Sequence, residues 1–208
     1  MDIFADASAA CAALAEREPT LRRALVPIGA PHIRRRAGGF EGLFRIIVEQ
    51  QVSVPSAQAI WRRCQERFDV ADAGAVLGAG PDDLRACGLS GPKTRYVLGL
   101  AEALATGALE FRALAHLTDE EASAQLQSIK GVGPWTAGIY LLFCEGRIDI
   151  WPPRDVALKG AYNAAKVRRP FLEQEALDAR ALRWAPYRGV AAHILWTYYA
   201  HINNRKPI

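Results

Sequence analysis

The sequence predicts an all-α protein, and three observations support this fold class. Ala and Leu, which favour helices, are abundant, whereas β-branched residues are scattered along the chain. Apolar residues recur at helical spacing, and the periodic stretches are interrupted by Gly or Pro. No pair of alternating stretches flanks a hairpin turn. The 208 residues suffice for one large domain or two small lobes with a buried core.

Several helix starts carry recognisable signals. Thr20 and Thr118 can each accept a backbone N–H as a cap, and Glu121 would complete a capping box with Thr118. First-turn positions, where a missing N–H costs nothing, are suggested by Pro55, Pro81, Pro92 and Pro134. The expected helices are 7–17, 20–27, 40–52, 55–68, 70–78, 81–87, 91–106, 119–128, 134–145, 155–166, 172–183 and 187–202.

Composition and charge narrow the class of protein. The net charge of +4 fits a nucleic-acid partner without specifying one. The basic run Arg34–Arg36 lies in an expected loop, where a solvated surface is a simpler interpretation than a phosphate contact. The four cysteines lack C-x-x-C spacing and the histidines form no ligand motif, so we expect no iron–sulfur cluster and no protein-ligated catalytic metal. Without a signal peptide or membrane-length stretch, the expected location is cytoplasmic.

The stretch LQSIKGVGPWTAGIYLLF (126–143) predicts a tight helical hairpin. One short helix ends at KGVG, and Pro134 opens a second helix. The glycines permit unusual backbone conformations and leave no side chain over the amides. Free N–H groups at the start of the second helix attract anions, phosphate above all. Taken alone, GVG is better explained by an ordinary helical hairpin with a glycine C-cap.

In its wider window this stretch resembles the helix-hairpin-helix (HhH-GPD) of the DNA glycosylase superfamily, whose usual text is L-x-x-[ILF]-x-G-[IV]-G-x-[WK]-T-A. The resemblance implies that the hairpin grips the DNA backbone without reading its sequence. It assigns this contact to the amides of Gly131, Gly133 and Thr136, with Lys130 on phosphate or solvent. It also implies a monovalent cation, Na⁺ or K⁺, held by backbone carbonyls of Gln127, Ile129 and Val132.

The same resemblance identifies a catalytic acid. In the superfamily an essential Asp follows the hairpin after a Pro-containing loop, and DIWPPRDVALKGAY supplies Asp155 there, whereas Asp149 matches less well. Asp155 also reads as the N-cap of helix 155–166, and the two roles are compatible. Cleavage of an N-glycosidic bond builds positive charge on the sugar, which a fixed carboxylate stabilises. Asp155 could also orient or deprotonate the attacking water.

Trp135 stands where strand-cutting members carry a nucleophilic Lys. The resemblance therefore implies base excision by water without strand cleavage. An aromatic face also attracts the cationic 3-methyladenine and 7-methylguanine, by roughly 0.5 to 2 kcal/mol. Pattern alone would place Trp135 in the core.

Three further stretches resemble the 3-methyladenine glycosylase II branch. FEGLFRIIVEQQVS places Gln51, with Gln50 beside it, as the wedge that fills the gap left by a flipped base. LRACGLSGPKTRYVLGLA suggests a second phosphate clamp at Gly91, Lys93 and Thr94. RWAPYRGVAAHILW places Trp196 in the base pocket or in the core, and Ile139 stands where the best-known bacterial member of the branch has an aromatic pocket residue.

Together these motifs imply a two-lobed helix-hairpin-helix glycosylase with its active site in the cleft between the lobes. One lobe would hold residues 40–155, including the hairpin 119–145, and the other would combine 1–39 with 156–208. The expected reaction removes alkylated purines from duplex DNA and leaves an abasic site, with no organic cofactor and a monomeric protein. The alternatives are a glycosylase for another lesion, a non-catalytic DNA-binding module, and a plain helical scaffold.

Overall fold

The computed structural model describes residues 3–206, and within that range every regular element is helical, which confirms the all-α prediction. No helix in this range is both long and apolar enough to cross a bilayer. The α-helices are α1 (Ile3–Arg17), α2 (Pro19–Ile28), α3 (Gly39–Glu49), α4 (Val54–Arg67), α5 (Ala73–Ala86), α6 (Gly91–Ala105), α7 (Phe111–Leu114), α8 (Asp119–Gln127), α9 (Pro134–Tyr140), α10 (Val156–Ala165), α11 (Gln174–Ala181) and α12 (Arg188–Ile202); a π-helix η1 (Leu141–Glu145) extends α9, and a 3₁₀-helix η2 (Leu182–Trp184) follows α11.

The chain divides into two compact units, one formed by residues up to 35 together with residues from 146 onward, the other by residues 36–145. The second boundary therefore lies earlier than the expected one at residue 155. Its cause is contact between segments distant in the sequence: the Arg188 side chain pairs with Asp149 at 2.9 Å, and the Gly189 amide donates to the carbonyl of Ile148. These contacts hold the 146–155 segment, and with it Asp155, in the same unit as α12. The location of an active site between the lobes stays a prediction.

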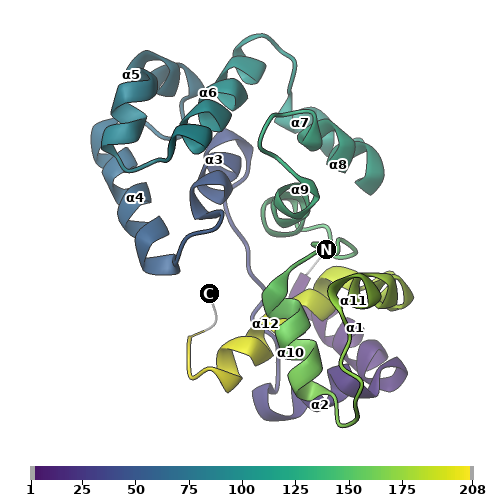
Figure 1. Cartoon of the computed structure of the whole chain (residues 1–208). Coiled ribbons are helices and arrows are strands. Elements are labelled where there is room, and N and C mark those ends of the chain that lie inside the picture. Colours follow the sequence, from purple (N-terminus) through teal and green to yellow (C-terminus); the bar gives the residue numbers. More distant parts are fainter. Residues whose placement is uncertain (1–2, 207–208) are drawn as a thin grey trace. The chain divides into compact units, whose positions relative to one another are not determined.

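Helix α3 forms the core of the unit 36–145, where it contacts α4, α6, α7 and α9 (Figure 1). Most of its residues are buried, and fully buried Phe44 meets Trp61 edge-on, with ring centroids 5.2 Å apart. Burying such a side chain contributes about 1.5–3 kcal/mol. Truncation of Phe44 to Ala would leave a cavity and cost about 3–5 kcal/mol. The hairpin is anchored on this core because α9 packs against α3.

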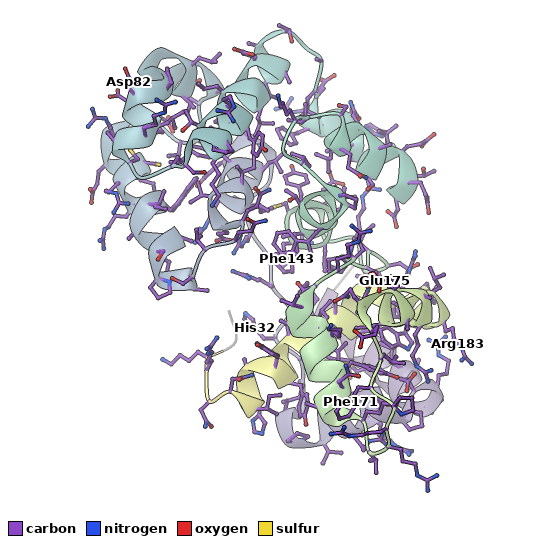
Figure 2. The ribbon with its side chains drawn as sticks, in the orientation of Figure 1. His32, Asp82, Phe143, Phe171, Glu175 and Arg183 are labelled. Carbon is purple, nitrogen blue, oxygen red and sulfur yellow. The ribbon has the colours of Figure 1, made fainter. Side chains whose placement is uncertain are left out.

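Helix α12 has the same role in the other unit, where it packs on α1, α2 and α10 (Figure 1). Buried Trp184 fills the space beside Trp151 and Tyr162, with centroids 5.4 and 5.8 Å away. The segment between α2 and α3 contacts α12 at His32, whose backbone amide donates to Thr197 Oγ1 at 2.9 Å (Figure 2 labels His32). Helix α10, and with it the N-terminal end of the helix, is held in place by packing on α2 and α12.

The helix caps and helix breaks expected from the sequence were confirmed in part. The Thr118 capping box is present in both directions, with N···O distances of 2.9 and 3.2 Å. The expected break before Pro81 appears as a kink at Gly80, whose φ is +72°. The Thr20 cap was wrong: the preceding Glu18 accepts the Thr20 amide instead. The short helix α7 was not expected.

Candidate active site

Asp155 is the N-cap residue of α10, as its sequence position predicted. Its Oδ1 accepts the amides of Ala157 at 2.9 Å and Leu158 at 3.0 Å, and only 9% of the residue is exposed. A carboxylate at this end of a helix is stabilised by the amides and by the helix dipole. The acid is thus held in one orientation at the edge of the unit's core.

The loop before Asp155 is held by Asp178 of α11, a residue that sequence reasoning missed. Its two carboxylate oxygens accept the indole N–H of Trp151 at 2.8 Å and the amide of Arg154 at 3.0 Å. Arg154 has a φ of +60°, a conformation that a side chain disfavours, so the turn that presents Asp155 needs this external support. No local pattern signals the contact, because Asp178 lies in a different helix.

Asp149, the other acid considered, is a structural residue. Its carboxylate forms a two-pronged ion pair with the Arg188 guanidinium and also accepts the Arg188 amide at 3.0 Å. Such paired geometry fixes a helix start and occupies both oxygens. The structure therefore favours Asp155 over Asp149 as the candidate acid.

The two glycines of the hairpin between α8 and α9 have different roles. Gly131 has a φ of +90°, and a Cβ there would lie 2.1 Å from the Tyr96 ring, so only glycine fits. Gly133 is exposed, has a φ of −93°, and a Cβ there would meet nothing within 4 Å. Within residues 3–206, the amides of Gly131, Gly133 and Thr136 have no hydrogen-bond partner. This is the arrangement that a phosphate-binding hairpin requires.

The predicted cation ligands lie at the end of α8. Within the described chain, the carbonyls of Gln127 and Val132 accept no hydrogen bond, while that of Ile129 accepts the Val132 amide at 3.0 Å. Carbonyl oxygens suit hard cations, and each retains a lone pair. The set therefore fits a monovalent cation, which stays a prediction.

Gln50 and Gln51 differ in their environment. The side-chain amide of Gln50 donates through Nε2 to the carbonyl of Gly131 at 3.1 Å and to Thr136 Oγ1 at 2.9 Å, which ties the turn after α3 to the hairpin. Gln51 is exposed and has a φ of +52°. The structure therefore makes Gln50 a brace and leaves Gln51 as the projecting side chain that a wedge needs.

The proposed second phosphate clamp is corrected by the structure. The Lys93 ammonium donates to the carbonyls of Val48 at 2.7 Å and Gln50 at 2.6 Å, and burial lowers its pKa. Thr94 is buried and its amide donates to the Ser90 carbonyl. These carbonyls engage two of the three N–H donors of the Lys93 ammonium, and Thr94 belongs to the core, so the structure gives both residues a role inside their unit. Gly91, in the first turn of α6, is half-buried, and its backbone amide donates to no described residue.

The expected pocket residues lie in both units. Trp135 is half-buried in the first turn of α9, whereas Ile139 is 4% exposed and packs in the core. Trp196 of α12 is half-buried and meets His193 edge-on at 5.7 Å. Burial, followed by the charges of His32 and Arg34, lowers the pKa of His193 to about 3. His193 therefore stays neutral at physiological pH and acts as a packing partner of Trp196.

The basic run was also partly misassigned. The Arg36 guanidinium pairs with Glu49 of α3 at 2.6 and 2.9 Å and lies 5.8 Å from the ring centroid of Phe143, which is labelled in Figure 2. Arg36 is therefore an internal brace of its unit instead of a solvated surface residue.

A helical hairpin with open amides, together with an acid fixed at the start of a later helix, defines a helix-hairpin-helix protein. The model of the "HhH-GPD superfamily base excision DNA repair protein" matches residues 44–186, and the chain belongs to this family.

Relatives and solved structures agree with this assignment. The DNA-3-methyladenine glycosylase 1 of Schizosaccharomyces pombe is 28% identical over 81% of this chain and 76% of its own length. A DNA-3-methyladenine glycosidase structure from Bacillus halodurans superposes with a TM-score of 0.76 at 26% identity, covering 93% of this chain and 90% of that one. The S. pombe 3-methyladenine DNA glycosylase Mag1 in complex with abasic DNA gives 0.77 at 26% identity, covering 85% and 89%. For a relative from Bacillus subtilis, the match covers 74% of this chain but 56% of that protein.

Proposed function

We propose that this protein is a DNA glycosylase that hydrolyses the N-glycosidic bond of alkylated purines in duplex DNA and leaves an abasic site. The observation that carries the proposal is Asp155, a nearly buried carboxylate held by two amides at the start of α10. The family match and the names of the relatives supply the reaction class. The substrates would be bases such as 3-methyladenine and 7-methylguanine.

The chemistry follows from where charge develops. As the bond to the base breaks, positive charge builds on the sugar, and an anion fixed beforehand stabilises that state without having to reorganise. The stabilisation grows where water is excluded, because the local dielectric falls. Asp155 would also orient or deprotonate the water that attacks the sugar. The Asp178 contacts keep the preceding loop, and therefore this carboxylate, in position.

Trp135 supports hydrolysis without strand cleavage. An indole has no nucleophilic amine, so no Schiff base with the sugar can form at this position. Its ring would instead attract a cationic alkylated base. Such bases are already good leaving groups, so the site would need no acid to protonate them.

Duplex DNA would be held by the hairpin. The open amides of Gly131, Gly133 and Thr136 would donate to backbone phosphates, with exposed Lys130 adding charge. Gln51 would fill the gap left by the extruded nucleotide, whose unstacking costs a few kcal/mol. A bound Na⁺ or K⁺ at the carbonyls of Gln127, Ile129 and Val132 would add positive charge beside the same phosphate.

The proposal is tested with purified protein and a panel of duplexes that carry one lesion each. Release of 3-methyladenine or 7-methylguanine, followed by chromatography, is the expected result, and the product strand should break only after alkali treatment. Spontaneous strand breakage with a trapped protein–DNA adduct would contradict the absence of a lyase step. Release of an oxidised or deaminated base alone would replace the substrate class. Binding without release of any base would leave a non-catalytic DNA-binding module.

A further inference from the structure

The unit that contains Asp155 also has a basic pocket that neither the motifs nor the family match explain. It has a volume of about 440 Å³ and lies among the start of α2, the end of α10 and the loop after it. This volume is within the range of small-molecule sites. Its walls include the apolar side chains of Pro19, Val167 and Leu172 and the ring of Tyr162.

The charges that line this pocket are unbalanced. Four cationic side chains face one carboxylate: Arg23, Lys166, Arg168 and Arg180 against Glu18. Burial alone would raise the pKa of Glu18, but hydrogen bonds from Arg180 and the Thr20 amide outweigh it, so the pKa is lowered. Glu18 is therefore ionised and is neutralised by Arg180 at 2.8 Å. Three cations remain without an acidic partner in the lining.

One of these three cations comes from α2 and the other two from the segment after α10, and they differ in how many hydrogen bonds hold them. The Arg23 guanidinium is oriented by bonds from Nε to the Ala165 carbonyl at 2.8 Å and from Nη2 to Thr20 Oγ1 at 3.2 Å, which leave Nη1 available. Lys166 is directed by a bond to the carbonyl of Pro170. Arg168 is exposed and makes no polar contact with any described residue. A guanidinium that is already oriented loses less entropy when it binds an anion.

From this pocket we infer a binding site for a phosphate monoester whose attached organic group rests on the apolar wall. A carboxylate would balance only one of the three cations, whereas a phosphate monoester carries about −1.5 to −2 charge and three acceptor oxygens. Arginine pairs with phosphate through two parallel hydrogen bonds. A free nucleotide and the 5′-phosphate at the end of a DNA strand are both phosphate monoesters, whereas each internal phosphate of DNA is a diester with one negative charge. The inference does not rest on the proposed excision reaction, because it concerns binding alone.

The experiment titrates the intact protein with adenosine 5′-monophosphate by calorimetry, for wild type, Arg168→Ser and Arg183→Ser. Arg183 is the matched control, because it is exposed in η2 of the same unit and does not line the pocket (Figure 2). Its replacement by Ser removes the same charge as Arg168→Ser does. Binding to wild type and to Arg183→Ser should agree within about twofold. Arg168→Ser should bind at least about tenfold more weakly, the loss expected for a charge-assisted hydrogen bond, and Arg168→Lys should recover part of the affinity.

A second arm identifies the source of the phosphate. The affinity for an undamaged duplex, with and without 5′-phosphates on its strands, is measured over a range of salt concentrations for the same variants. If a strand end of DNA supplies the phosphate, Arg168→Ser alone should lower the salt dependence by about one unit of log–log slope, and only for the duplex with 5′-phosphates, since each phosphate contact contributes about 0.9. If a free nucleotide supplies it, only the calorimetric arm should respond. The inference is overturned if Arg168→Ser and Arg183→Ser behave alike in both arms.

Discussion

Replacing Gly131 by Ala should destabilise the protein far more than the same change at Gly133. At Gly131 the φ of +90° costs an L-residue about 1–2 kcal/mol. The added Cβ would also lie 2.1 to 2.6 Å from three atoms of the Tyr96 ring, and forcing such overpacking typically costs about 1–3 kcal/mol. The two effects together predict a loss of about 2–5 kcal/mol in the free energy of unfolding.

Gly133→Ala should leave stability unchanged or slightly raised. Its φ of −93° is accessible to Ala, and the new methyl group would meet no atom within 4 Å. The same methyl group would stand beside the Gly133 amide, one of those that we assign to the DNA backbone. We therefore expect normal unfolding but DNA binding weaker by about tenfold, the loss of one charge-assisted hydrogen bond.

Urea denaturation followed by circular dichroism measures the stabilities, and fluorescence anisotropy with a labelled duplex measures binding. Combining Gly131→Ala with Tyr96→Ala should restore part of the lost stability, because it removes the steric clash but not the backbone strain. A Gly131→Ala protein within about 0.5 kcal/mol of wild type would refute the role of Tyr96. A Gly133→Ala protein with full DNA affinity would refute the assignment of these amides.

Two further predictions concern other parts of the chain. Lys93→Met should cost about 1–3 kcal/mol of unfolding free energy and slow base excision, because the carbonyls of Val48 and Gln50 lose a charged donor. The control Lys130→Met, at an exposed position, should leave stability unchanged. Because folding lowers the pKa of His193 from 6.5 to about 3, the unfolded chain binds a proton there between these values and the folded protein does not. The free energy of unfolding should therefore be highest above pH 6.5 and fall as the pH drops towards 3. Its dependence on pH should be weaker in His193→Gln, and an unchanged dependence would contradict the assignment.

Elements that depend on local signals were largely predictable. The capping box at Thr118 and the cap at Asp155 were found because the interacting groups lie within three residues of each other. The break at Gly80 followed from the Gly-Pro pair. The Thr20 cap failed because Glu18, a residue type less favoured at caps, is recruited by Arg180 from α11.

Contacts between distant segments could not be read from the sequence. Lys93 resembled a phosphate ligand by its place in a helix start, yet its ammonium reaches α3, more than forty residues away along the chain. The support by Asp178 of the loop before Asp155 and the brace formed by Gln50 also join segments that lie far apart along the chain. Such side chains find partners through the packing of whole helices, which a local pattern does not encode.

The most direct test of the account is the single-turnover rate of 3-methyladenine release by Asp155→Asn. Asn caps helices about as well as Asp, so the variant should keep its fold and its affinity for DNA while losing the negative charge. The account predicts a fall in the release rate of at least about a hundredfold, as when one preorganised charge-stabilising group is removed, with unfolding and DNA binding unchanged. A variant that releases the base at the wild-type rate would contradict the assignment of Asp155 as the catalytic acid.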